Sequence, residues 1–162
     1  MDTINIKIAG LGGMGVLSAA SVLAEAAFQA GYDIKKAEVH GMSQRGGSVA
    51  SDIRFGDRVL SPMIPASEVD FLVTLAPEWL DVHRGELRPS GKILTPDDVD
   101  GLANKRALNV ALMGALSRFL PITETVWHDA LAKGFPKKLH DSNLAAFQFG
   151  REKAEPQTTQ PS

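Results

Sequence analysis

The sequence contains no cysteine. The chain therefore forms no disulfide, has no thiol nucleophile and offers no thiolate ligand to an iron–sulfur cluster. If electrons pass through such clusters, a partner protein must hold them. Histidine is also scarce, and the four histidines do not follow the H-x-H or H-E-x-x-H spacing of metal sites, so we expect no metal on this chain.

An excess of one charge and long apolar runs are missing as well. Lys and Arg total 17 against 19 for Asp and Glu, so the chain lacks the basic surface that nucleic acid or anionic lipid would require. Its apolar stretches fall short of the roughly 20 residues of a membrane-spanning helix, and its first residues lack the basic segment of a secretory signal. We expect a cytoplasmic protein that binds neither nucleic acid nor membranes.

The composition is that of an ordinary globular protein. The 162 residues are 44% hydrophobic, which is enough for one domain with an apolar core. Apolar positions alternate in some segments and recur at helical spacing in others, which distinguishes strands from helices. We predict strands at residues 4–9, 33–40, 49–55, 71–75 and 92–95. We predict helices at residues 14–30, 107–120, 123–133 and 143–149, and a further helix that starts near residue 76.

The order of these elements predicts the fold class. We expect an α/β fold with a three-layer open, mostly parallel, Rossmann-like sheet and helices on both faces. One domain is expected over residues 1–153, and Pro89-Ser90-Gly91 predicts a turn before its last strand. Residues 154–162 are expected to be a disordered tail, because no apolar residue follows Ala154.

A glycine-rich segment follows the first predicted strand and opens the first helix. Its glycines are Gly10, Gly12, Gly13 and Gly15, and three of them satisfy the pattern G-x-G-x-x-G. Gly10 would permit a tight turn, Gly12 a close ligand, and Gly15 close packing of helix on strand. Such a turn suits a pyrophosphate, with Glu38 or Asp33 as a ribose-binding carboxylate; the alternative is a purely structural role.

A second polar segment follows the next strand. It combines an imidazole, a hydroxyl, an amide and a guanidinium among glycines: His40, Gly41, Ser43, Gln44, Arg45, Gly46 and Gly47. Arg45 is suited to clamp a phosphate or carboxylate, and His40 to donate to an oxyanion or to move a proton. The alternative is a polar turn that bonds its own backbone or a neighbouring subunit. Because open α/β sheets bind ligands where their strands end, we expect both segments to face one cleft.

Together these two segments resemble the gamma subunit or domain of pyruvate and 2-oxoacid:ferredoxin oxidoreductases. The most similar version is the beta subunit of indolepyruvate oxidoreductases. The resemblance extends through Ser61-Pro62, residues 70–75, 109–116 and 143–150, so it covers nearly the whole chain. One departure is the stretch between Leu94 and Asn109, which is shorter than is usual in this family.

The resemblance implies a complex that decarboxylates a 2-oxoacid on thiamine diphosphate, passes electrons through iron–sulfur clusters to ferredoxin and forms acyl-coenzyme A. This chain would bind none of these cofactors alone; it lacks the glycine-aspartate-glycine thiamine motif, since Gly56-Asp57 is followed by Arg58. The resemblance implies that thiamine diphosphate-binding and ferredoxin-like subunits are its partners. Its two glycine-rich segments would form part of an intersubunit active-site wall, with no catalytic residue assigned on this chain.

Two further expectations and two alternatives accompany this interpretation. The isolated chain is expected to be inactive, and it is able to form a homodimer through a face that partners would otherwise cover. A stand-alone NAD(P)-binding Rossmann protein is the first alternative. A non-catalytic scaffold module is the second.

Overall fold

The computed structural model describes residues 1–40 and 47–154. Five strands form one sheet in the order β2-β3-β1-β4-β5. Their bounds are β1 (Ile4–Leu11), β2 (Asp33–His40), β3 (Ser48–Gly56), β4 (Val69–Thr74) and β5 (Leu87–Leu94). β1 pairs in parallel with β4 and β4 with β5, while β3 runs antiparallel to both β1 and β2. The α/β class is confirmed, and the sheet is mixed, with β3 as the strand of opposite direction.

Helices connect and cover the strands. The α-helices are α1 (Val16–Gln29), α2 (Leu80–His83), α3 (Leu108–Ser117), α4 (Glu124–Gly134) and α5 (His140–Lys153). The short 3-10 helices are η1 (Pro77–Trp79), η2 (Arg84–Glu86), η3 (Pro96–Val99), η4 (Lys105–Ala107) and η5 (Lys137–Leu139). None of the helices in the described residues is both long and apolar enough to cross a membrane. The tail prediction lies, from residue 155 on, outside the described residues.

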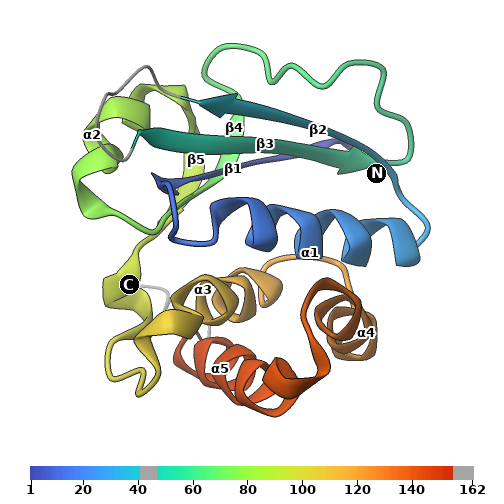
Figure 1. Ribbon diagram of the computed structural model, residues 1–162. Helices are drawn as coiled ribbons and strands as arrows, with labels where there is room; N and C mark the ends of the chain where they lie inside the picture. The colour runs from blue at the N-terminus through green and yellow to red at the C-terminus, as the bar shows by residue number, and fades with distance from the viewer. Residues whose placement is uncertain (41–46, 155–162) are drawn as a thin grey trace, which may run out of the picture.

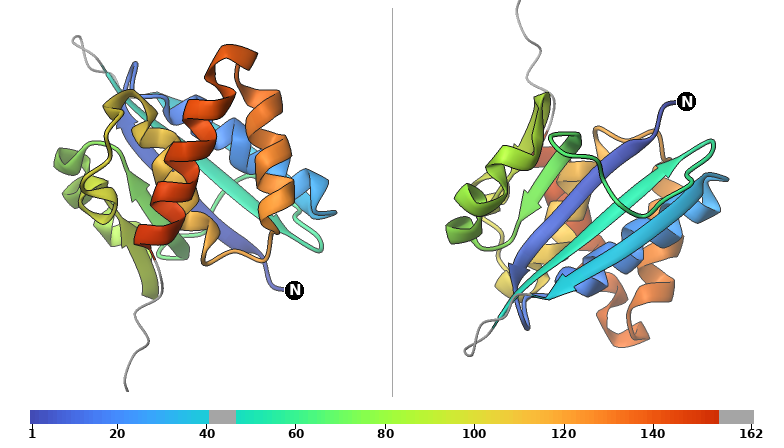
Figure 2. Two further views of the ribbon diagram at one scale, coloured as in Figure 1. Left: turned by 90° about the horizontal axis from the view of Figure 1, so that it is seen from below. Right: turned by 90° about the horizontal axis from the view of Figure 1, so that it is seen from above.

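The four longer helices, α1, α3, α4 and α5, lie on the same side of the sheet (Figure 1). On the other side the structure has the loop between β3 and β4 and the short helical segment around α2 (Figure 2). The expected third layer is thus reduced to short segments. The reason lies in β1, whose alternate residues Asn5 and Lys7 give that face a polar character that does not suit the apolar stripe of a long helix.

Charged groups pair on this polar face. The Lys7 ammonium is buried, and its Nζ lies 2.7 Å from Asp52 Oδ1 of β3 and 3.4 Å from Glu86 Oε1 of η2. Glu86 Oε2 in turn lies 2.6 Å from His83 Nδ1. Because a buried charge is costly without a partner, the ion pairs of Lys7 with Asp52 and Glu86 hold η2 against the sheet.

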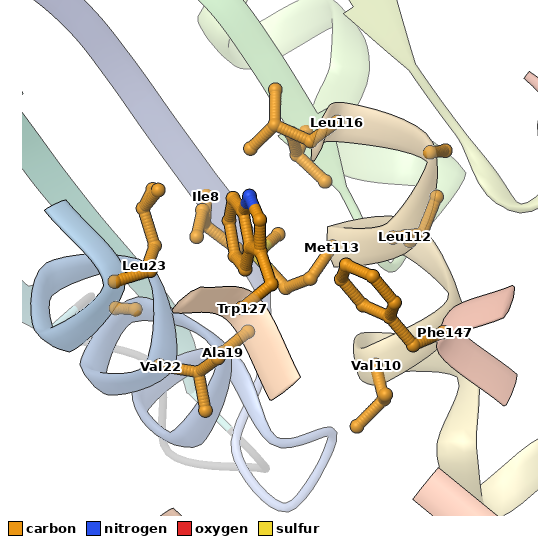
Figure 3. Packing of buried hydrophobic residues seen from close by; sticks show 14 of the residues in the cluster. Ile8, Ala19, Val22, Leu23, Val110, Leu112, Met113, Leu116, Trp127 and Phe147 are labelled. Carbon is orange, nitrogen blue, oxygen red and sulfur yellow. The ribbon is translucent and has the colours of Figure 1, made fainter. Parts of the chain in front are cut away.

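Aromatic and aliphatic side chains fill the space between the sheet and its helices (Figure 3). Trp127 of α4 and Phe147 of α5 are both fully buried, with ring centroids 5.6 Å apart. Helices α3 and α5 approach very closely beside them, because Gly114 and Gly150 lack side chains at the crossing. A Cβ on Gly150 would lie 1.8 Å from the carbonyl oxygen of Ala111.

Two details of the prediction were wrong. The turn expected at Pro89-Ser90-Gly91 lies inside β5. β5 is an edge strand, where a proline costs no ladder hydrogen bond if its nitrogen faces outward. The last helix is also longer than predicted: it starts at His140 and runs to Lys153. Polar residues on its exposed face concealed its extent in the sequence.

Candidate functional site

The two glycine-rich segments meet at the end of the sheet where β1 and β2 finish. The backbone N–H of Gly12, which follows β1, donates to the carbonyl oxygen of Gly47, which precedes β3, over 3.1 Å. β1 and β2 run in the same direction, so their carboxyl ends lie at the same end of the sheet. The expectation that both segments face one cleft therefore holds for the residues that the structure describes.

An open pocket of about 530 Å³ lies where they meet. It is lined by residues of both segments and of the start of α1: Leu11, Gly12, Gly13, Gly15, Val16, Leu17, Ser18, His40 and Val49. Four predicted site residues are among them: Gly12, Gly13, Gly15 and His40. Five others lie outside the described residues: Gly41, Ser43, Gln44, Arg45 and Gly46.

Gly10 and Gly15 have roles that differ from those predicted from the sequence. Gly10 still lies in β1, and a Cβ there would be 2.9 Å from Val16 Cγ2, so Gly10 is the glycine that lets α1 approach the strand. Gly15 has a φ of +83° and packs against α3, where a Cβ would be 2.4 Å from Asn109 Nδ2. Gly13 has a φ of +88°, and a Cβ there would have no atom within 4 Å.

Asn109 is a supporting residue whose role sequence reasoning did not assign. It is buried at the start of α3, and its Nδ2 donates to the carbonyl oxygen of Gly15 over 3.2 Å. The same carbonyl accepts the N–H of Ala19. The available signal was a lone amide in a helix that is otherwise almost entirely apolar, since a buried polar group needs a partner.

The first turn of α1 gives the pocket its electrostatic character. Gly15 is the N-cap, no side chain caps this end, and the first turn has no acidic residue. The leading N–H groups of a helix have no intrahelical acceptor, and they carry the positive end of the helix dipole. Because Val16, Leu17 and Ser18 line the pocket, its inner wall is suited to an anionic group.

The carboxylates considered for a ribose are not in the pocket lining. Glu38 is absent from it, and its Oε1 lies 3.5 Å from Lys36 Nζ. Asp33 is at the opposite end of β2, where its Oδ2 accepts the N–H of Val59 over 2.7 Å. This hydrogen bond lowers the pKa of Asp33 below its ordinary value.

The other histidines lie away from this pocket. His83 pairs with Glu86, while His140 Nε2 lies 3.0 Å from the carbonyl oxygens of Ala132 and Phe135. Within residues 1–40 and 47–154, no three His, Asp or Glu side chains are grouped as a metal ion would require. The pocket offers one imidazole, one hydroxyl and backbone amides, so by itself it is equipped for binding.

Comparisons with known proteins identify a family and agree with this fold. The family model described as pyruvate ferredoxin/flavodoxin oxidoreductase matches residues 5–101, which include both glycine-rich segments. The chain is 31% identical to indolepyruvate oxidoreductase subunit IorB of Thermococcus kodakarensis, over 93% of this chain and 95% of that protein.

Solved structures share the fold. The gamma subunit of a keto/oxoacid ferredoxin oxidoreductase from Geobacter sulfurreducens has a TM-score of 0.74 and 21% identity, over 93% of this chain and 98% of that one. A 2-oxoglutarate:ferredoxin oxidoreductase from Magnetococcus marinus, solved with 2-oxoglutarate, coenzyme A and succinyl-CoA bound, has a TM-score of 0.80 and 19% identity. The match covers 95% of this chain but 31% of that one, so the same fold is there part of a longer polypeptide. The resemblance drawn from the glycine-rich segments is confirmed, and the chain belongs to the pyruvate ferredoxin/flavodoxin oxidoreductase family.

Proposed function

We propose that this chain is a subunit of a 2-oxoacid:ferredoxin oxidoreductase complex and that its pocket forms part of an active-site wall shared between subunits. The proposal rests on the observation that both glycine-rich segments border one pocket. The N–H of Gly12 donates a hydrogen bond to the Gly47 carbonyl oxygen, and His40 lines the pocket. Relatives are named as subunits of indolepyruvate, pyruvate and 2-oxoglutarate enzymes, so we assign 2-oxoacids as the substrate class.

Partner subunits supply the redox chemistry in this proposal. The sequence has no cysteine, so iron–sulfur clusters do not fit this chain, and it has no thiamine motif. A thiamine diphosphate-binding subunit and a ferredoxin-like cluster subunit are therefore the partners we assign, with ferredoxin as the electron acceptor. Bound to its partner, thiamine diphosphate supplies the carbanion chemistry that releases carbon dioxide from the 2-oxoacid.

This chain contributes binding and orientation at its pocket. The amides of Val16, Leu17 and Ser18 attract an anion, and both a 2-oxoacid carboxylate and the pyrophosphate of coenzyme A have that charge. The His40 imidazole, at the end of β2, is able to donate a hydrogen bond to a ligand oxygen. The pocket is open, so a partner surface would have to close it before water is excluded.

Two single histidine variants test the proposal in the assembled complex. We expect His40→Ala to lower turnover of a 2-oxoacid by about tenfold or more, as the loss of one positioned hydrogen bond does. His128→Ala, which removes a histidine from α4 outside the pocket, should leave turnover unchanged. Both variants should assemble with the partners as the parent does. Equal turnover of parent and His40→Ala would remove His40 from the site.

An independent NAD-binding role has weaker support from the geometry. In dinucleotide-binding sheets the strand that carries the ribose-binding carboxylate lies beside the glycine-turn strand. Here β3 lies between β1 and β2, which moves β2 about 10 Å from β1, at about 4.8 Å per strand spacing. Calorimetric titration of the isolated chain with NAD tests the NAD-binding alternative, and we expect no heat of binding.

A further inference from the structure

The two edges of the sheet differ in their capacity to pair with another strand. β5, at one edge, contains Pro89 and Gly91, and its register with β4 shifts between Val69 and Phe71. Proline, glycine and irregular register are features that block pairing at an edge. β2, at the other edge, pairs with β3 in unbroken register over Asp33–His40 and contains neither proline nor glycine.

Apolar side chains lie exposed beside the open edge of β2. Phe28 of α1 is 67% exposed, and Val39 of β2 is 56% exposed on the face of the sheet turned away from α1, since it alternates with Lys36. Helix α1 lies next to β2, since Lys36 Nζ lies 3.5 Å from Ser21 Oγ (Figure 2). The exposed flank of α1 runs from Leu17 through Ser21 to Phe28. The open backbone edge and the apolar helix flank therefore form one continuous surface.

We propose that this surface binds a second copy of the chain, with the two β2 strands paired antiparallel across a two-fold axis at Ala37. The two five-stranded sheets would then continue into each other. Closed two-fold dimers are the commonest assemblies of identical chains, and such an interface must be complementary to itself. The order of charges along β2 meets this condition with the axis at Ala37, which also lies near the middle of the strand.

The register follows from the charges. In an antiparallel pair related by a two-fold axis, residues directly opposite lie on the same face, so the axis passes through one residue position. An axis at Lys36 sets two ammonium groups opposite each other, and an axis at Glu38 sets two carboxylates opposite each other, both unfavourable. An axis at Ala37 places Lys36 opposite Glu38 of the second copy, twice, with a small side chain at the centre.

The helix layer matches the same axis. α1 is connected to β2 by a tight turn and runs back along it, so Phe28 lies near the start of β2 and Leu17 near its end. Antiparallel pairing reverses the second copy, and Phe28 of each copy is brought toward Leu17 of the other. With the axis at Ala37, Ile34 of one copy lies opposite His40 of the other. The roughly 20 Å from Ile34 to His40 along β2 is close to the about 16 Å from Leu17 to Phe28 along α1, so the ends of the two helices come near each other in the same register.

A single introduced thiol tests the axis, because the natural chain has no cysteine. Ala37→Cys places one thiol on each side of the axis, about 5 Å apart at Cβ, and a short bifunctional thiol reagent should cross-link it into a covalent dimer. Val82→Cys provides the control: Val82 is 60% exposed on α2, away from β2, and should not cross-link. A dimer in which Ala37→Cys fails to cross-link overturns the proposal.

Charge reversal tests the register independently. Lys36→Glu or Glu38→Lys alone sets like charges opposite each other and should weaken the dimer about tenfold in sedimentation equilibrium. The double reversal restores opposite charges and should recover the parent affinity. Circular dichroism confirms that each variant is folded. A full-length chain that stays monomeric up to its solubility limit, or a double variant as weak as the singles, would overturn the proposal and leave this edge to a different subunit.

Discussion

Asn109 of α3 occupies the space where residue 15 would carry a side chain. Its Nδ2 donates to the Gly15 carbonyl over 3.2 Å, and a Cβ on residue 15 would lie 2.4 Å from that nitrogen. Gly15 also has a φ of +83°, a conformation that favours glycine. The contact fixes α3 against the turn that shapes the pocket, so Gly15 is required for both conformation and packing.

Gly15→Ala is therefore expected to destabilise the protein more than Gly13→Ala. Both positions have positive φ, which costs an alanine about 1 kcal/mol, but a Cβ on Gly13 meets no atom within 4 Å. The clash with Asn109 should add about 1–3 kcal/mol to the cost in urea unfolding. The double variant Gly15→Ala/Asn109→Ala should recover part of that added cost. Equal losses for the two single variants would show that Asn109 moves aside freely.

Gly12→Ala should separate activity from stability. Gly12 is not among the glycines with positive φ, and a Cβ there would lie 3.8 Å from the Gly47 oxygen, an ordinary contact distance. The free energy of unfolding should change by no more than about 0.5 kcal/mol. Because the methyl group occupies the pocket, turnover of the assembled complex should fall. Unchanged turnover would mean that no ligand approaches this part of the turn.

Gly150→Ala should destabilise the crossing of α3 and α5. Helix propensity alone favours alanine over glycine by about 1 kcal/mol. A Cβ on Gly150 would lie 1.8 Å from the Ala111 oxygen, so the helices must separate, and we expect a net loss of about 3 kcal/mol in thermal or urea unfolding. Gly85→Ala is the control, since no atom lies within 4 Å of its Cβ position. A neutral Gly150→Ala would contradict this account of the core.

Asp33 should make a pH-dependent contribution to stability. The N–H of Val59 holds its folded pKa below the unfolded value of about 3.9, so the stabilisation is present above that value and is lost as pH falls through the folded pKa. Asp33→Asn keeps an acceptor but removes the charge. Urea midpoints of the two proteins should differ at pH 7 and converge in acid. A difference that grows in acid would have the wrong sign.

The sequence predicted local structure best where glycines mark the ends of an element. β2 was predicted at residues 33–40 and is found there, because Gly31 ends the preceding helix and the glycine-rich segment follows His40. β5 was predicted too short, since Pro89 and Gly91 are turn residues in most settings; here they are tolerated because β5 is an edge strand and its register with β4 shifts at this point. The insertion of β3 between β1 and β2 depends on tertiary pairing, which no local pattern contains.

The candidate site shows the same division. The meeting of the two glycine-rich segments followed from strand direction and is seen in the bond from Gly12 to Gly47. The partner of Gly15 did not follow, because Asn109 is 94 residues away and belongs to a helix with no motif. The burial of Lys7 between carboxylates was equally hidden, since in sequence it reads as a solvent-facing strand residue.

Reconstitution tests the central claim most directly. The full chain would be assayed for 2-oxoacid-dependent ferredoxin reduction alone, with its thiamine-binding and cluster-bearing partners, and with those partners lacking this chain. We expect turnover only when all are present. Turnover by this chain alone, or undiminished turnover by the partners without it, would contradict the role of a subunit that completes the active-site wall.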